Sequence, residues 1–380
     1  MAQKEHPAPF DLPNLPPALE YGDLVEYTSP AHASLARLDE ILRHIPNPAL
    51  IEHTFMTREA VLSSQIEGTQ ATLEEVFKKE AEEGDAIGET DQQGQDIREI
   101  LNYRKALREG VRLVDTHQPL AENNVKALHA ILLQSVRGRT RAPGAFRREQ
   151  VYIAPPGTPI ANARYIPPTP AQIPDLYSNF DRYLNTENAE RDPLVQIAVA
   201  HYQFEAIHPF ADGNGRVGRL LIPLFLYQRR ILARPYLYIS QYLEAHRRDY
   251  YDLLADVSYK GAWTPWVRFF LTGLREHAEN AASLARAIIT MQHTYEHDLV
   301  ALHSPYASDM LKAIFMQPIF TTTQLRNTSG IENVQTTLNL IQKFVQAGIL
   351  TDTTPERQRN KTYACAPLLK LLSTHTADTN

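Results

Sequence analysis

Twelve consecutive residues, from His208 to Arg219, combine the side chains that phosphate chemistry requires. The segment is His-Pro-Phe-Ala-Asp-Gly-Asn-Gly-Arg-Val-Gly-Arg, which brings an imidazole, a carboxylate and two guanidinium groups together. Its Gly-Asn-Gly turn leaves successive backbone N–H groups able to converge on an anion. Arg216 and Arg219 are three residues apart, so both can lie on one helix face and bind anion oxygens as forks. The segment therefore indicates a site for a phosphate-bearing ligand.

Two helices are expected to position this segment. Residues 194–207 are mostly apolar and contain no glycine or proline, which predicts a helix. Residues 220–227 continue helically on the other side. The segment should therefore be a short loop whose glycines stand at the start of the second helix. The positive end of that helix would favour an anion.

Composition excludes several classes of protein. The 380 residues allow two or three domains, and 38 basic against 44 acidic residues argue against a coat for nucleic acid. Cys365 is the single cysteine, so the chain has no disulfide framework and no thiolate metal cluster. No apolar run reaches membrane-spanning length, and residues 1–17 are polar and proline-rich, unlike a signal peptide. We expect a soluble protein of the reducing cytoplasm with no membrane contact.

Helical periodicity dominates the remaining chain, so the expected fold class is mainly α. Ser29 and Pro30 are expected to open the first long helix as its N-cap and first-turn proline. Val151–Ile153 and Ile160–Ile166 are β-type runs around a Pro/Gly turn and predict a small β-hairpin. The other predicted helices cover residues 48–68, 69–82, 96–115, 121–136, 169–184, 191–207, 247–260 and 263–292.

The C-terminal residues predict a winged helix-turn-helix. Three short helices are followed by strands at 348–350 and 362–364, which is the order of that motif. Seven basic against five acidic residues after residue 303 are too small an excess to choose between DNA and a protein as partner. Loop-like stretches at 84–95 and 293–305 suggest three domains, at residues 1–92, 93–292 and 300–373.

The motifs resemble those of the Fic (Fic/Doc) family. The segment from His208 matches every fixed position of the family signature, which is His-x-Phe-x-Asp/Glu-Gly-Asn-Gly-Arg-x-x-Arg. Ser63-x-x-x-Glu67-Gly68 resembles the inhibitory helix of members that are autoinhibited from their N-terminal side. The hairpin at 151–166 falls where the family has a β-hairpin flap. The resemblance covers residues 45–275, and appended winged helices are common in such chains.

This resemblance implies a Fic-type helical core and a protein adenylyltransferase, which transfers AMP from ATP to a Ser, Thr or Tyr hydroxyl of a protein. His208 would take the hydroxyl proton as a general base. Asp212 would bind Mg²⁺ beside the phosphate oxygens, and Phe210 would turn into the core. The residues implied in binding ATP are Glu67, Gly213, Asn214, Gly215, Arg216, Val217, Gly218, Arg219, Tyr250 and Tyr251.

The resemblance also implies regulation and partners. Glu67 would pair with Arg219 and keep it from the γ-phosphate, while Ser63 would hydrogen-bond the catalytic loop and Gly68 would complete the motif. The 151–166 hairpin would hold a protein substrate as an added strand, or a segment of the chain itself in auto-AMPylation. A DNA or protein partner would bind through 300–373. A homodimer is one assembly through which inhibition could be released.

Several alternatives stay open at this point. The same fold could remove AMP from a modified protein, with Glu67 orienting water, or could sense nucleotide in a DNA-binding regulator. His201, Glu205 and His208 share a helical face and could bind a metal, although His201 fits an ordinary helix residue better. Tyr250 and Tyr251 could be plain core. Doc-type kinases have Ala-Asn-Lys where this chain has Gly-Asn-Gly, which favours nucleotidyl transfer over phosphorylation.

Overall fold

The computed structural model describes residues 8–45, 48–83, 92–136, 141–154, 157–187, 189–300, 303–359 and 361–374. The chain divides into two compact units, each assembled from segments that are distant in sequence. The first unit contains Met1–Ala36 and Asn102–Ala278, and the second contains Arg37–Leu101 and Glu279–Asn380. No helix in the described ranges is both long and apolar enough to cross a bilayer.

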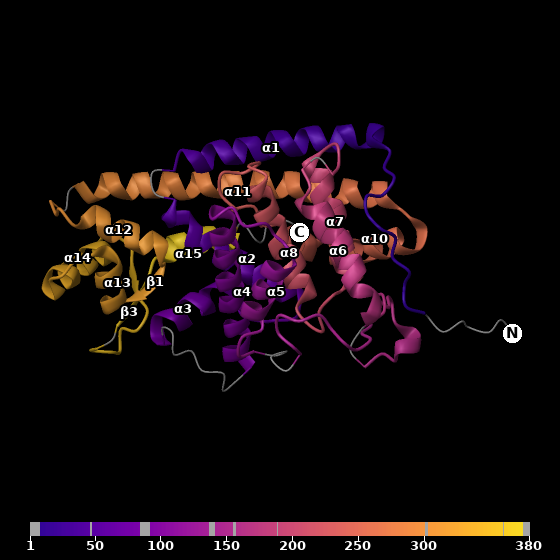
Figure 1. Cartoon of the computed structure of the whole chain (residues 1–380). Helices are drawn as coiled ribbons and strands as arrows, with labels where there is room; N and C mark the ends of the chain where they lie inside the picture. The colour runs from indigo at the N-terminus through magenta and orange to yellow at the C-terminus, as the bar shows by residue number, and fades with distance from the viewer. Residues whose placement is uncertain are drawn as a thin grey trace. The chain divides into compact units, whose positions relative to one another are not determined.

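The first unit is helical and is built around two buried helices, α7 (Pro193–Ile207) and α8 (Asn214–Gln228), which pack against each other (Figure 1). Every residue from Leu194 to Ile207 except Glu205 is buried, as expected of a helix with neighbours on all sides. α6 and α10 pack on α7, and α5 packs on α8. The other elements that lie at least partly in this unit are η1 (Tyr21–Leu24), α1 (Val25–Arg43), α4 (Gln92–Asp115), α5 (Glu122–Leu132), η3 (Ile160–Asn162), η4 (Pro170–Gln172), α6 (Ile173–Asn185), α9 (Ser240–Ala245), α10 (Arg247–Lys260) and α11 (Trp263–Leu299).

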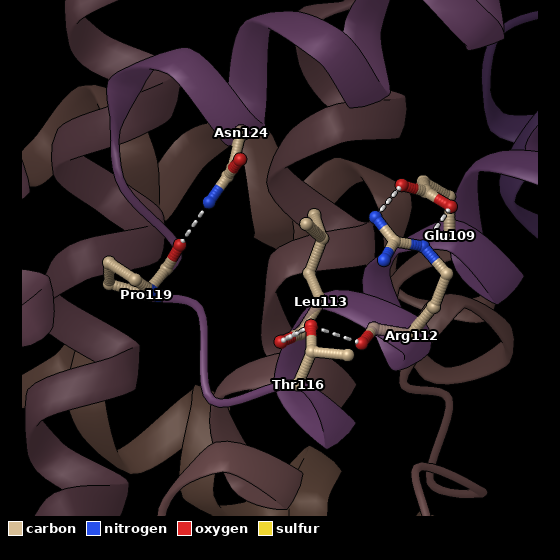
Figure 2. Close-up of polar contacts among 6 residues, drawn as sticks. All are labelled: Glu109, Arg112, Leu113, Thr116, Pro119 and Asn124. Carbon is tan, nitrogen blue, oxygen red and sulfur yellow. Dashed lines mark hydrogen bonds and ion pairs between the residues drawn. The ribbon is translucent and has the colours of Figure 1, made fainter.

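The turn between α4 and α5 is fixed by local hydrogen bonds, which Figure 2 shows. Thr116 Oγ1 donates to the carbonyl of Arg112 (2.9 Å), satisfying one of the last carbonyls of α4. Asn124 Nδ2 donates to the carbonyl of Pro119 (2.8 Å) and ties the first turn of α5 to the incoming chain. The direction of α5 is thereby set, and with it the place of His129 near the end of that helix.

The proline-rich segment before α1 packs on other residues of the first unit. Asn179 accepts from the backbone N–H of Leu15 at 2.7 Å and donates to its carbonyl at 3.1 Å. Gln203 Nε2 donates to the carbonyl of Pro13 at 3.0 Å. Leu12 and Leu15 are buried. Side-chain amides therefore supply hydrogen bonds to the backbone of an extended segment that does not pair in a β-sheet.

The second unit joins α2 (Ala49–Ile66) and α3 (Leu73–Glu83) to the C-terminal part of the chain (Figure 1). α12 packs against α2, and β1 packs against α3. A small core of Phe77, Ala81, Ile319 and Ala364 joins the two parts, and Gln324 Nε2 donates to the carbonyl of Glu80 (2.9 Å). The C-terminal elements are α12 (Ala307–Met316), β1 (Ile319–Thr321), α13 (Thr322–Ser329), α14 (Val334–Gln346), β2 (Thr351–Asp352), β3 (Thr362–Ala364) and α15 (Ala366–Thr374).

The C-terminal sheet is antiparallel and has the order β1-β3-β2. Phe320 lies opposite Tyr363, and Asp352 also lies opposite Tyr363. The three helices and the strand at 362–364 were predicted correctly, whereas the strand predicted at 348–350 is found at Thr351–Asp352, and β1 and α15 were not predicted. β1 is only three residues long, which is too short for a period-two pattern to be recognised.

Several predicted boundaries were wrong, among them the end of the helix predicted at 121–136, since α5 ends at Leu132. Pro30 does not begin a helix, because α1 begins at Val25 and contains the proline in its second turn. α3 begins at Leu73 rather than at Thr69, since Thr72 accepts from the N–H of Glu75 and the Glu75 carboxylate accepts from Thr72, a reciprocal cap. α11 continues through residues 293–299 and ends at Leu299.

The predicted hairpin is less regular than expected. Among the residues that the structure describes there, its two arms meet at one β-bridge, Ile153 with Tyr165, rather than in a longer ladder. Ile160–Asn162 forms a 3₁₀ turn within the returning run. The acidic loop predicted at 84–95 lies mostly outside the described residues, and α4 begins at Gln92.

Candidate active site

His208 occupies a constrained position at the end of α7. It is the C-cap of that helix and adopts a left-handed conformation, with φ 48° and ψ 60°. A non-glycine residue in this region costs about 1–2 kcal/mol, so surrounding contacts must hold it there. Its Nδ1 lies 3.4 Å from the carbonyl oxygen of Glu205. In the tautomer that donates from Nδ1, Nε2 carries the lone pair that can accept a proton.

Asn214 braces the loop from within. Its Oδ1 accepts from the backbone N–H of Phe210 (2.9 Å), and its Nδ2 donates to the carbonyl of Phe210 (2.8 Å). Phe210 is fully buried, which confirms that it turns into the core. Both ends of the Asn214 amide are thus used to fix the backbone between His208 and the second helix.

The start of α8 has the geometry of an anion site. Gly213 is its N-cap in the left-handed conformation (φ 78°), and the helix begins at Asn214. Arg216 and Arg219 lie on the first two turns and are 4% and 2% exposed. Arg216 Nη2 lies 3.5 Å from Asp212 Oδ1, and the Asp212 side chain is 39% exposed. A helix N-terminus, the guanidinium of Arg216 and one accessible carboxylate therefore meet at this turn, and Arg219 follows one turn later on the same helix.

His129 supports the loop from α5, and sequence reasoning missed it. Its imidazole stacks on Phe210 at 3.8 Å between centroids and an angle of 9°. The N–H of Gly144 donates to Nδ1 (2.9 Å), so Nε2 carries the proton and donates to the carbonyl of Asp212 (2.9 Å). Burial lowers the pKa of His129 to about 4. The hydrogen bond to the Asp212 carbonyl raises this pKa, and the positive charge of Arg216 lowers it further. His129 is therefore neutral at physiological pH and holds one tautomer.

Arg147 is the second residue that the sequence did not reveal. It is 4% exposed and its guanidinium contacts the backbone of the loop that begins at His208, with Nε donating to the carbonyl of His208 (2.8 Å). It lies between the predicted helix at 121–136 and the predicted hairpin at 151–166, where the sequence suggested no element and no site. Its partner is 61 residues away, so no local pattern could have assigned it a role.

Gly218 and Val217 have packing roles in the structure. Val217 is fully buried. A Cβ added at Gly218 would lie 2.4 Å from Glu205 Oε1 and 3.2 Å from Phe204 Cδ1. A larger residue at this position would have to displace the Glu205 carboxylate and crowd the ring of Phe204, so glycine favours the close approach of α8 to α7.

Tyr250 and Tyr251 differ in exposure. Tyr250 is 2% exposed, its hydroxyl lies 3.0 Å from His201 Nε2, and its ring lies in a cluster that also contains Trp266. Burial lowers the pKa of His201 to about 3, and the nearby charge of Arg219 adds to this effect. Tyr250 and His201 are thus parts of the core. Tyr251 is only partly buried and lies near the guanidinium of Arg164, at 5.8 Å from its ring centroid.

The residues of the predicted inhibitory motif lie in the second unit. Ser63 is fully buried on α2. Glu67 is the C-cap of this helix on an exposed turn, and Gly68 follows with a φ of 100°. That positive φ explains the glycine, because other residues rarely adopt it.

Comparison with known proteins agrees with this site. Residues 119–226 match the Fic/DOC family, and residues 25–112 match the Fic/DOC family N-terminal region. The chain belongs to the Fic/DOC family. The matched Fic region includes α5, α7 and the whole segment from His208 to Arg219, so the family assignment rests on the same residues as the site geometry.

Relatives and solved structures extend this result. The Fic-family chain is 31% identical over 248 residues to the protein adenylyltransferase Fic of Culex quinquefasciatus, covering 63% of this chain and 43% of that protein. It is 37% identical over 127 residues to the protein adenylyltransferase Fic of Aedes aegypti, covering 33% of this chain and 22% of that one. The chain thus spans less than half the length of these curated relatives.

The fold is that of solved Fic proteins. A Fic family protein from Desulfovibrio desulfuricans G20 superposes with a TM-score of 0.57 at 22% identity, over 92% of this chain and 98% of that one. Fic-1 (residues 134–508) from C. elegans superposes with a TM-score of 0.51 at 20% identity, over 70% of this chain and 74% of that one.

Proposed function

We propose that this Fic-family protein is a protein adenylyltransferase, which transfers AMP from ATP to a hydroxyl group of a protein. One observation carries the proposal. A constrained imidazole, His208, ends one buried helix, and an anion-binding turn at Gly213 begins the next. The base and the phosphate site are therefore held on opposite ends of a single short loop, which is what attack of a hydroxyl at a phosphorus atom requires.

The reaction follows from these groups. The imidazole of His208 accepts the proton of an incoming Ser, Thr or Tyr hydroxyl, whose oxygen forms a bond to the α-phosphorus of ATP. The bond from this phosphorus to the bridging oxygen of the β-phosphate breaks, and pyrophosphate leaves. N–H groups at the start of α8, together with Arg216 and Arg219, stabilise the charge on the phosphate oxygens. Asn214 acts on the loop, since its amide is bonded to Phe210.

Asp212 fits a role in holding Mg²⁺. Its carboxylate is 39% exposed beside the anion site, and Mg²⁺ in proteins usually takes one or two carboxylates together with phosphate oxygens. The metal would neutralise phosphate charge when bound. For the adenine, we favour Tyr251 over Tyr250, because only the ring of Tyr251 is partly exposed.

The decisive experiment measures transfer of label from α-phosphate-labelled ATP to protein by the full chain. We expect His208→Ala to abolish transfer while nucleotide binding persists, because the phosphate-binding turn is intact. A matched control is His117→Ala, since His117 also has a positive φ but lies in the turn after α4, outside the site. Transfer by His208→Ala at the wild-type rate would refute the proposal.

We also propose that Glu67 and Ser63 restrain this activity, with Glu67 competing with the γ-phosphate of ATP for Arg219. The support is the Ser-x-x-x-Glu-Gly motif at the end of α2. A protein substrate would add as a strand to the hairpin at 151–166. A change in a homodimer is one way in which the inhibition by Glu67 could be relieved. Cys365, the single cysteine, is buried and fits a cytoplasmic location.

The C-terminal elements support a winged helix in the second unit. α13 and α14 precede the β2–β3 hairpin, and β1 completes the sheet. We propose that this module binds a partner, either DNA or a protein. Binding of the full chain to duplex DNA, weakening steeply with salt, would favour DNA, whereas no salt-dependent binding would favour a protein.

A further inference from the structure

We propose that Arg147 is a positioning residue that couples the 151–166 hairpin to His208. This inference rests on the proposed function, because the hairpin is where the protein substrate would bind. Arg147 lies just before the hairpin, and its contacts reach the catalytic loop and both ends of the hairpin.

The guanidinium of Arg147 donates to backbone carbonyls on three segments. Nε donates to His208 (2.8 Å), and Nη2 donates to Pro168 (2.5 Å) and more weakly to Ile207 (3.4 Å). Nη1 donates to Glu149 (3.2 Å). Glu149 precedes the hairpin and Pro168 follows it, so one rigid planar group joins both ends of the hairpin to the backbone of the catalytic residue.

The carbonyls at which α7 passes into the loop are held by Tyr165 and Arg147. The hydroxyl of Tyr165, on the returning arm of the hairpin, donates to Ala206 (2.9 Å). The side chain of Arg147 takes the next two carbonyls, and its backbone N–H donates to Pro209 (2.9 Å). Four consecutive carbonyls, 206 to 209, therefore accept from Tyr165 or Arg147. The last carbonyls of a helix have no intrahelical donors, so these contacts act as its cap.

The charge of Arg147 serves the same purpose. No carboxylate pairs with it among the described residues, and two of its carbonyl partners, those of Ile207 and His208, lie at the negative end of α7. Burial lowers the pKa of Arg147 to about 10, so the group stays protonated at neutral pH. A buried cation committed to carbonyls is costly to move. It holds His208 in its left-handed conformation, and a shift of either hairpin arm shifts the backbone of His208.

The consequence concerns alignment of the substrate. A segment that adds to the hairpin is placed relative to the hairpin backbone, and Arg147 places that backbone relative to His208. The hydroxyl and the base are thereby brought into register, although Arg147 itself touches neither. Arg147 should affect the rate of transfer at saturating nucleotide and not the affinity for nucleotide.

The test compares Arg147→Lys with Arg148→Lys in the full chain. Lysine keeps the charge but cannot span three segments, and Arg148 is an exposed neighbour. We expect Arg147→Lys to lower the transfer rate about 30-fold at saturating ATP, with the dissociation constant for a non-hydrolysable ATP analogue within about threefold of wild type. Arg148→Lys should match wild type in both. An unchanged transfer rate, or a parallel loss of nucleotide affinity, would overturn the proposal.

A second variant guards against misfolding of the first. Tyr165→Phe removes only the hydroxyl that donates to Ala206, and we expect it to slow transfer about three- to tenfold with nucleotide affinity unchanged. Combined with Arg147→Lys, the loss should be smaller than the product of the two single effects, because both act on one run of carbonyls. Multiplicative losses would show that the two contacts act separately and would contradict the coupling.

Hydrogen exchange tests the coupling without any enzymatic activity. The amide of His208 donates to Phe204 and that of Ile153 donates to Tyr165, so each reports on one side of the link. Arg147→Lys should speed exchange at both amides, and Arg148→Lys at neither. If no variant transfers AMP, the proposed function fails while this result still decides the coupling. Faster exchange at one amide alone would refute it.

Discussion

The imidazole of His129 lies flat on the ring of Phe210, with 3.8 Å between centroids, while its Nε2 donates to the carbonyl of Asp212. One side chain thus holds the catalytic loop at two points, through an apolar face and through a polar edge. Because Nδ1 accepts from Gly144, the ring must stay neutral to keep both hydrogen bonds. The loop therefore depends on the protonation state of a residue that takes no part in the chemistry.

Acid should destabilise the protein through His129. Its pKa in the folded state, about 4, lies below the ordinary value of 6.5, so the unfolded chain binds the proton more tightly. The free energy of unfolding should fall as the pH drops from about 6.5 to about 4, by roughly 3 kcal/mol from this residue. His201, with a pKa of about 3, adds a loss of the same sign.

Urea unfolding of wild type and His129→Gln between pH 4.5 and pH 7.5 measures this effect. Glutamine does not titrate, so the variant should be less stable at pH 7 but should lose less stability on acidification. Equal pH dependence in the two proteins would exclude His129 as the source. His201 remains in both proteins, so some acid sensitivity should persist in the variant.

Gly218→Ala should destabilise the packing of α8 on α7. The added methyl would lie 2.4 Å from Glu205 Oε1, so the helices must separate or the carboxylate must move. We expect a loss of about 1–3 kcal/mol in the free energy of unfolding. Gly22→Ala is the control, since nothing lies within 4 Å of a Cβ there, and it should change stability by less than about 0.5 kcal/mol. Similar values for the two variants would contradict the close-approach explanation.

Asp192 should stabilise α7 from its first turn. Its Oδ1 accepts from the N–H of Leu194 (2.8 Å), and its Oδ2 lies 2.9 Å from His32 Nε2. Asp192→Ala should cost about 1–2 kcal/mol through loss of the cap, whereas Asp192→Asn should retain most of it. Denaturant unfolding at neutral pH compares them, and equal losses in the two variants would argue against capping.

The contact between His32 and Asp192 predicts a change of stability with pH that is opposite in sign to that caused by His129. The hydrogen bond to Asp192 raises the pKa of His32 above 6.5. Its contribution to stability is therefore complete below pH 6.5 and is lost as the pH rises through the raised value. The stability difference between wild type and His32→Gln should shrink from pH 6 to pH 9, and a constant difference would contradict it.

Glu67→Gly should raise auto-AMPylation if Glu67 restrains the site. We expect an increase of at least about tenfold, since a restraint of 1.4 kcal/mol already corresponds to a factor of ten. Glu67→Gln should act in the same direction, and Glu74→Gln, at an exposed glutamate on α3, should have no effect. Label lost from AMPylated protein with wild type but not with Glu67→Gly would instead assign the reverse reaction.

Local sequence patterns were sufficient where contacts are local. The segment from His208 to Arg219 was predicted as a loop between two helices, and the structure confirms this, because the turn depends on its own glycines and on Asn214. The start of α3 was misplaced, although Thr72 and Glu75 have the spacing of a capping box. Pro30 misled because a proline in the second turn of a long helix gives the same sequence signal as one in the first.

Long-range support of the site could not be predicted in this way. His129 reaches Asp212 across 83 residues, and Arg147 reaches His208 across 61. Neither residue type is unusual at its position, since an apolar helix often carries a histidine and a surface loop often carries arginine. Only the folded arrangement distinguishes them from such ordinary residues. The roles assigned to Ser63, Glu67 and the ATP-contacting residues stay predictions.

The core that α3 shares with the C-terminal sheet limits where the protein can be truncated for experiments. Phe77 and Ala81 are buried against Ile319 and Ala364. A shortened protein that stops after α11 would lack Ile319 and Ala364 and would expose Phe77 and Ala81, so it would be prone to aggregate and would be a poor test of restraint by Glu67. The C-terminal elements and the helix that precedes Glu67 therefore belong to one folded unit, so a change in the C-terminal core also changes the support of the segment that carries Glu67.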